Sequence, residues 1–274
     1  MWYSLHGFIH DFNSLDKYIS NHFNVFLQNN NTYIKQFFYI RYWLGGPHIR
    51  FRFSCNHADD YAIVKGNFQE SITEFIRGND IALIDYHSFY KDSMLQNENI
   101  EDVYWCEHGS VQEIAYIPEY DRYGGEAHID QSECIFMESS KLTCSINTLN
   151  FQKRIVVGLD LIYLTFKLFN YTDEAYKNYS EIWAGYTAGQ KIVPLHHPVF
   201  TKRLAYLSNY DFSEQTIYYN YFLTLREKIY DKDDFSLIAS HIHMTNNRLG
   251  IHPEFEYEIS DFIYHSIGKK EVFT

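Results

Sequence analysis

The segment FFYIRYWLGGPHIRFRF, which runs from Phe37 to Phe53, has the pattern of a β-hairpin with a charged return strand. Its middle, Leu44–Pro47, combines two glycines with a proline and predicts a turn. Side chains alternate along a strand, so one face of the return strand is apolar and the other carries His48, Arg50 and Arg52. Such a charged face must meet water, a carboxylate or an anionic substrate. The last of these would make the hairpin part of an active site.

The two arginines have the spacing that carboxylate binding requires. Residues two apart on a strand face lie about 7 Å apart, so Arg50 and Arg52 can bind one or two carboxylates through paired hydrogen bonds. The alternative is a surface strand with solvated arginines. The aromatic residues on both sides of the pair favour partial burial.

The composition describes an acidic chain that is rich in aromatic residues. Its 274 residues can form one large domain or two small ones. The formal net charge is −12 and no Lys/Arg-rich run occurs, so binding of bulk nucleic acid is not expected. The 25 tyrosines suit binding of ligands with polar and apolar parts, although a place in the core is the simpler interpretation for any single tyrosine.

The sequence predicts a soluble cytoplasmic protein that does not enter a membrane. The N-terminus lacks the pattern of a signal peptide, and the longest apolar stretch, Ile155–Phe169, is charged at Asp160 and Lys167 and too short to span a bilayer. The four cysteines form no CxxC pair and are expected to be reduced and mostly buried. They are Cys55, Cys106, Cys134 and Cys144.

The chain is expected to be α+β, with a ferredoxin-like β-α-β-β-α-β half packed on a helical half as one unit. The first half covers residues 1–124 and the second 125–274. Besides the hairpin, the first half is predicted to hold strands at Trp2–Ile9, Ile81–Tyr90 and Gln112–Ile117 and helices at Ser14–Leu27 and His57–Arg77. The predicted helices of the second half are Glu126–Asn147, Phe151–Asn170, Asp173–Gly189, Ser213–Tyr230, Phe235–Leu249 and Pro253–Ile267.

A second candidate segment is YIPEYDRYGG, residues Tyr116 to Gly125. Pro118 ends a strand, and the two glycines permit a close approach to the following helix. Irregular charged loops at such junctions often hold binding residues. The alternative is a capped loop in which Glu119 and Arg122 form a surface pair.

A third candidate is HIHMTNNRLG, residues His241 to Gly250. On a helix, His241 and His243 lie about 200° apart, so both cannot face one site. Neither this spacing nor the absence of an HExxH motif favours a metal. One histidine as a general acid or base and a hydrogen-bonded structural histidine are the two remaining interpretations.

Taken together and in this order, the three segments resemble the C-terminal elimination domain of class I lantibiotic dehydratases. They also resemble the stand-alone thiopeptide biosynthesis proteins that derive from this domain. The resemblance spans nearly the whole chain, and it implies an enzyme that acts on a peptide whose Ser or Thr has been glutamylated. The enzyme removes the Cα proton and expels glutamate, which leaves dehydroalanine or dehydrobutyrine. The chemistry implies no metal or redox cofactor.

The resemblance also assigns roles to residues. It places the catalytic groups on Arg50, Arg52, Arg122 and His243, and makes His241 structural. Substrate-binding positions are His48, Glu119, Tyr123, Asn247 and Arg248. One departure from the family pattern is Glu138-Ser139, where Asp-Ser is usual, which bears on local capping.

The implied partners are a precursor peptide, with leader and modified core, and a separate glutamylating dehydratase subunit. The resemblance to the family also suggests a homodimer. Two alternatives remain. A pyridine synthase would use the same scaffold for a formal [4+2] cycloaddition of two dehydroalanines and then expel the leader. A non-catalytic subunit would bind the leader at a sheet edge.

Overall fold

The hairpin predicted from the sequence is present in the computed structural model, which describes residues 1–90, 95–96, 100–187 and 197–267. Its strands are β2, Ile34–Tyr42, and β3, His48–Cys55. They are joined by a tight turn in which Gly45 and Gly46 have φ angles of 93° and 101°. Only glycine adopts such angles without strain, which explains the glycine pair.

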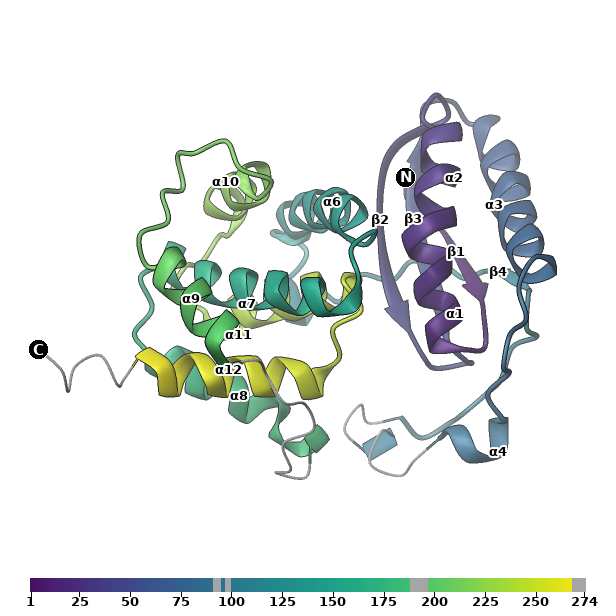
Figure 1. The fold of residues 1–274 in the computed structure, drawn as a ribbon. Helices are drawn as coiled ribbons and strands as arrows, with labels where there is room; N and C mark the ends of the chain where they lie inside the picture. Colours follow the sequence, from purple (N-terminus) through teal and green to yellow (C-terminus); the bar gives the residue numbers. More distant parts are fainter. Residues whose placement is uncertain (91–94, 97–99, 188–196, 268–274) are drawn as a thin grey trace, which may run out of the picture. The chain divides into compact units, whose positions relative to one another are not determined.

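Both strands belong to a four-stranded antiparallel sheet with the order β2-β3-β1-β4. The other two strands are β1, Tyr3–Phe8, and β4, Val111–Glu113. The sheet lies in the first of two compact units, Met1–Pro118, and the described part of the second, Glu119–Thr274, is helical (Figure 1). The α+β class is therefore confirmed, whereas the ferredoxin-like assignment and the division into halves of a single unit stay predictions.

Helices cover the apolar face of the sheet. They are α1 (Phe12–Lys17), the π-helical turn η1 (Tyr18–Phe23), α2 (Asn24–Asn29) and α3 (Asp60–Arg77). The ring centroid of Phe51 lies 5.3 Å from that of Phe23 and 5.3 Å from that of Phe68, and all three rings are fully buried. Because a shift of one residue would turn this apolar row outward, the packing fixes the register of β3. It also directs the charged residues of β3 to the opposite face.

One predicted strand is wrong. Residues Ile81–Tyr90 form irregular backbone followed by the short helix α4, Tyr86–Phe89. Phe89, at the end of this segment, packs on Trp105 instead, with ring centroids 5.2 Å apart. The fourth strand is β4, which is shorter than the predicted Gln112–Ile117.

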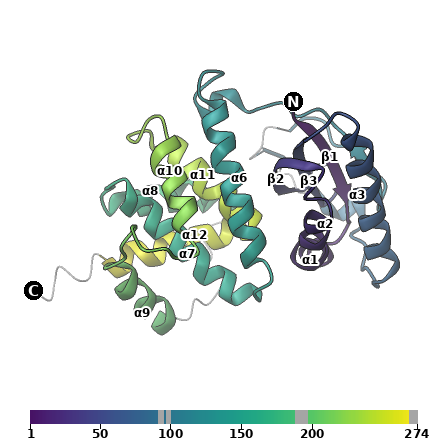
Figure 2. The same cartoon turned by 90° about the horizontal axis from the view of Figure 1, so that it is seen from above.

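The second unit is a bundle of helices. They are the 3-10 turn η2 (Tyr120–Tyr123), α6 (Ile129–Ile146), α7 (Phe151–Leu168), α8 (Glu174–Thr187), α9 (His197–Leu207), α10 (Tyr219–Lys228), α11 (Phe235–Arg248) and α12 (Pro253–Ile267). Helix α12 lies beside α8 (Figure 1), and α11 lies beside α6 (Figure 2). A helix stands at each of the six predicted places, and α9 is an addition. Helix α10 starts six residues later than predicted, because residues 213–218 form turns, and the predicted Ala188 and Gly189 lie outside the described residues.

All four cysteines are free thiols with intermediate exposure, so the prediction that most are buried is wrong. Cys55 ends β3 and Cys106 lies in an irregular segment, whereas Cys134 and Cys144 belong to a long helix of the second unit. In the parts of the chain that the structure describes, no helix has both the length and the apolar character needed to cross a membrane.

Candidate active site

We call the side of β3 that carries His48, Arg50 and Arg52 the basic face. On this face, His48 fixes the position of Arg50. The His48 ring is fully buried; its Nδ1 lies 2.7 Å from the carbonyl oxygen of Gly46, and its Nε2 lies 3.2 Å from Nε of Arg50. Burial, reinforced by the charge of Arg50, lowers the pKa of His48 to about 3. The ring is therefore neutral, donates from Nδ1 to Gly46, and accepts the Nε–H of Arg50 at Nε2. A buried imidazole thus orients a guanidinium.

Both arginines of the basic face stack on aromatic rings. The guanidinium carbon of Arg50 lies 3.4 Å from the ring centroid of Tyr42, and that of Arg52 lies 4.7 Å from the centroid of Tyr116. Stacking engages the face of a guanidinium, whereas a carboxylate binds at its edge. An arginine can therefore stack on an aromatic ring and bind a carboxylate at the same time. The aromatic rings hold the two guanidinium groups in defined planes.

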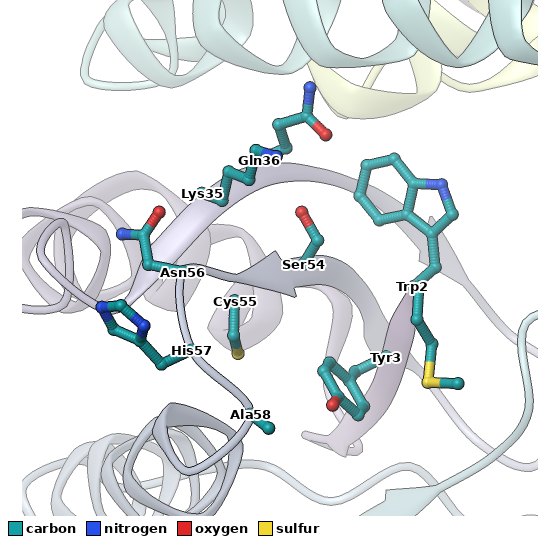
Figure 3. Close-up of a pocket in the computed structure, with 10 residues that line it drawn as sticks. Trp2, Tyr3, Lys35, Gln36, Ser54, Cys55, Asn56, His57 and Ala58 are labelled. Atoms are coloured by element: carbon teal, nitrogen blue, oxygen red, sulfur yellow. The ribbon is translucent and has the colours of Figure 1, made fainter.

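A cavity of about 250 Å³ opens at one end of the basic face (Figure 3). It is lined by residues 1–3 at the start of β1, residues 35–36 near the start of β2, and residues 54–58 at and beyond the end of β3. Gln36 and Ser54 are partners in the ladder and point to the same side of the strands in Figure 3. Because Ser54 follows Arg52 in the alternation of β3, the cavity adjoins the basic face. Its lining reaches the basic face through Ser54 and does not include Arg52.

In the second unit, Arg122 connects the loop before α6 to helix α11. Its Nε donates to Oγ of Ser240 at 3.1 Å, and its Nη1 donates to Oε2 of Glu119 at 3.2 Å. Gly124, two residues after Arg122, has a φ of 84°, and a Cβ at this position would lie 2.3 Å from the ring of Tyr230. Glycine is required at this position, which explains why the loop carries the sequence RYGG. The predicted surface pair of Glu119 and Arg122 is present, and so is an anchor that the sequence did not indicate.

His243 is held by a buried carboxylate. Its Nδ1 lies 2.7 Å from Oε1 of Glu256, a fully buried residue of α12. The other carboxylate oxygen accepts hydrogen bonds from the hydroxyl of Tyr179 and, at 3.1 Å, from Nδ2 of Asn246. The imidazole also stacks on Trp183, with ring centroids 4.3 Å apart and an interplanar angle of 28°. A carboxylate at Nδ1 fixes the tautomer in which Nε2 is the proton acceptor.

Helix α11 brings Arg122 and His243 to the same side of the second unit. Ser240, which Arg122 contacts, precedes His243 by three residues, and residues three apart on a helix are neighbours. Asn247 follows His243 by four residues and lies on the same face. A guanidinium and an imidazole therefore stand within about one helical turn of each other.

The remaining predicted residues lie in the interior. His241 is 1% exposed, its Nε2 lies 3.3 Å from Oγ of Ser132, and burial lowers its pKa to about 3. Tyr123 packs on Phe136 with ring centroids at 4.8 Å. Buried Arg248 donates from Nη1 to the carbonyl of Met244 at 2.7 Å, within its own helix. These contacts are those of structural residues; substrate binding by Tyr123 and Arg248 stays a prediction.

Sequence reasoning missed Glu256, Tyr179, Trp183 and Ser240. For Glu256, the sequence contains a pattern that could have indicated its role. Glu256, Ile259 and Ile263 are all fully buried and have the spacing of one helical face, so a carboxylate interrupts an apolar stripe. Buried carboxylates need partners, and such an interruption indicates a functional or structural pair. Among the described residues, no group of three or more His, Cys, Asp or Glu side chains could hold a metal ion.

Residues 2–267 match the protein family described as "Lantibiotic biosynthesis dehydratase C-term", and the chain belongs to this family. The epidermin biosynthesis protein EpiB of Staphylococcus epidermidis is 25% identical to the chain over 276 residues. The match covers 93% of the chain and 24% of EpiB, so the chain spans about a quarter of that relative.

Solved structures of low sequence identity share the fold. The tRNA dependent lantibiotic dehydratase MibB from Microbispora sp. 107891 matches 98% of the chain over 28% of its own length, with a TM-score of 0.60 and 16% identity. The pyridine synthase TbtD from thiomuracin biosynthesis matches all of the chain over 99% of its own length, with a TM-score of 0.69 and 13% identity. TsrL matches 99% of the chain over 95% of its own length, with a TM-score of 0.63 and 13% identity. The family comprises biosynthetic enzymes, and the fold is shared by members with different activities.

Proposed function

We propose that this chain eliminates glutamate from glutamylated Ser or Thr residues of a ribosomally made peptide, to give dehydroalanine or dehydrobutyrine. The observation that carries the proposal is the pairing of His243 with buried Glu256, one helical turn from the residue that anchors Arg122. This arrangement is suited to a proton transfer next to a cation. The arginine pair of the basic face supplies the affinity for a carboxylate.

The reaction needs a base, support for an enolate, and a site for the leaving group. Nε2 of His243 accepts the Cα proton, and the electron pair of that C–H bond forms the new double bond. The Cβ–O bond breaks, and glutamate leaves with its electrons as a carboxylate. Arg122 stabilises the negative charge that develops on the amide oxygen. For Arg50 and Arg52, the resemblance to the elimination domain implies binding of the free side-chain carboxylate of the glutamyl group.

The proposal implies a division of labour. A separate glutamylating subunit supplies the ester substrate, and the precursor peptide, with leader and modified core, binds to this chain in the cytoplasm. The cavity at Ser54, two residues after Arg52, gives space to peptide groups beside the modified residue. We retain the homodimer and the ferredoxin-like description of the sheet unit as further expectations.

Mass spectrometry of a glutamylated peptide incubated with the purified chain tests the proposal. Loss of glutamate with formation of the dehydro residue is expected for the wild type, and accumulation of intact glutamylated peptide for His243→Ala. A wild-type chain that leaves the ester intact, or a His243→Ala variant that eliminates at the wild-type rate, contradicts the assignment.

A second candidate function is pyridine synthesis by cycloaddition of two dehydroalanines with expulsion of the leader. The match to TbtD, which covers nearly the full length of both chains, favours it. A peptide that already carries two dehydroalanines distinguishes the candidates. A pyridine macrocycle with free leader supports the synthase, and an unchanged peptide supports elimination. Binding of the leader with neither reaction would support the non-catalytic role.

A further inference from the structure

Two side chains of β1 lie on the basic face beside its arginines. In the ladder between β1 and β3, Ser4 is the partner of Arg52 and His6 is the partner of Arg50. Partners in an antiparallel ladder point to the same face of a sheet. The His6 ring stacks on that of His48, with centroids 5.1 Å apart and an interplanar angle of 22°, which agrees with this placement.

Both of these side chains are buried with unsatisfied polar atoms. Ser4 is 4% exposed and His6 is 3% exposed. Within the part of the chain that the structure describes, Oγ of Ser4 and Nδ1 of His6 make no hydrogen bond. Native proteins rarely leave buried polar groups unpaired, because each unpaired group costs free energy. Two such groups side by side on one strand indicate that something else completes their hydrogen bonds.

The groups around Ser4 and His6 determine what kind of ligand could complete their hydrogen bonds. Burial, with the positive charges of Arg50 and Arg52 contributing, lowers the pKa of His6 to about 2, so its imidazole is neutral. A neutral imidazole and a hydroxyl can each donate one hydrogen bond. Next to two guanidinium groups, the matching ligand is an anion with more than one acceptor oxygen, and a carboxylate fits this description.

We propose that Ser4 and His6 donate hydrogen bonds to a substrate carboxylate that Arg50 and Arg52 attract. This inference rests on the proposed elimination, in which that carboxylate is the side chain of the glutamyl group. The four side chains then form one binding site on the basic face. Ser4 and His6 select a carboxylate by hydrogen bonding, and the arginines supply the charge.

Binding of two unreactive peptides tests this site. In both peptides a diaminopropionate replaces the modified serine, and its amine carries a glutamyl group in one and a 2-aminobutyryl group, which lacks the side-chain carboxylate, in the other. We expect Ser4→Ala and His6→Phe each to weaken binding of the glutamyl peptide about tenfold, the effect of one hydrogen bond to a charged group. Binding of the aminobutyryl peptide stays unchanged, and Ser4→Thr, which keeps the hydroxyl, keeps the affinity.

Gln112→Ala is the matched control, because Gln112 is the β4 partner of His6 but is exposed. It leaves binding of both peptides unchanged. Equal weakening of both peptides by Ser4→Ala, or no weakening of either, overturns the inference. If His6→Phe does not fold, the comparison of Ser4→Ala with Ser4→Thr decides.

The elimination assay separates this inference from the proposed function. A wild-type chain that eliminates glutamate but binds the two peptides equally well overturns the carboxylate site alone. A wild-type chain that prefers the glutamyl peptide but does not eliminate glutamate overturns the proposed function alone.

Discussion

Glu256 of α12 lies against His243 of α11, with Oε1 of the carboxylate 2.7 Å from Nδ1 of the imidazole. The carboxylate is fully buried and also accepts hydrogen bonds from Tyr179 and Asn246, whereas 17% of the His243 side chain is exposed. One end of the pair is therefore fixed by the protein interior and the other reaches solvent. This is the arrangement of a histidine whose tautomer and direction are set before a substrate binds.

Replacement of Glu256 by Gln is expected to lower kcat of elimination on the order of 10²-fold, because the amide no longer favours the tautomer with Nε2 as acceptor. KM for the glutamylated peptide changes little, since Glu256 does not reach the surface. Glu254→Gln, two residues earlier in the first turn of the same helix, is the control and retains activity. Steady-state kinetics measure both constants, and equal kcat values for Glu256→Gln and the wild type would contradict the role of the pair.

Arg50→Lys is expected to raise KM for the glutamylated peptide at least about tenfold, with a smaller change in kcat. Lysine lacks the Nε–H that bonds to His48 and the planar group that stacks on Tyr42. Arg41→Lys is the matched control on the neighbouring strand, where Arg41 pairs with Asp16 at 2.9 Å. Steady-state kinetics compare the two variants. If both raise KM equally, Arg50 has no specific role in substrate binding.

The hairpin could be predicted because local features determine it. A strand with period-two alternation and a turn with paired glycines specify both register and facing, so Arg50 and Arg52 fall on one side without knowledge of the rest of the chain. The same holds for His241 and His243, whose separation on a helix allows only one of them to face a site. Helix bounds such as Pro253–Ile267 follow from the proline and from the apolar period.

Pairing across the fold could not be predicted in this way. The contact between His243 and Glu256 depends on how α11 and α12 pack, and that of Arg122 with Ser240 joins residues 118 positions apart. The erroneous strand at Ile81–Tyr90 has a related cause, because its aromatic residues find partners in a distant segment rather than in a sheet. In each of these places the structure depends on tertiary packing, which the local sequence pattern does not reveal.

Gly124→Ala is expected to destabilise the second unit by about 1–3 kcal/mol, because alanine is strained at positive φ and its Cβ would meet the ring of Tyr230. Gly125→Ala separates the two causes, since Gly125 has a φ of 81° but no heavy atom within 4 Å of the added Cβ. It should show the smaller loss. Urea unfolding of both variants measures the free energies. Equal losses would mean that contact with Tyr230 does not restrict position 124.

The acid stability of the second unit is expected to depend on His241. Burial, with the charge of Arg248 adding to it, lowers the pKa of this imidazole from 6.5 to about 3 in the folded chain. Between these two values the unfolded state binds a proton that the folded state does not, so this contribution to stability is present above pH 6.5 and lost as the pH falls. For an unfolded pKa of 6.5, lowering the pH from 7 to 5 costs about 2 kcal/mol.

His241→Gln removes the titrating group, so the difference between the free energies of unfolding at pH 7 and pH 5 should shrink by about 2 kcal/mol relative to the wild type. Ser132→Ala is the matched control, because it removes the hydrogen-bond partner of His241 but leaves the imidazole buried. That variant loses stability by a similar amount at both pH values and keeps the wild-type pH dependence. Urea unfolding of the three proteins at the two pH values makes the comparison. An unchanged pH dependence in His241→Gln would show that this imidazole does not titrate on unfolding.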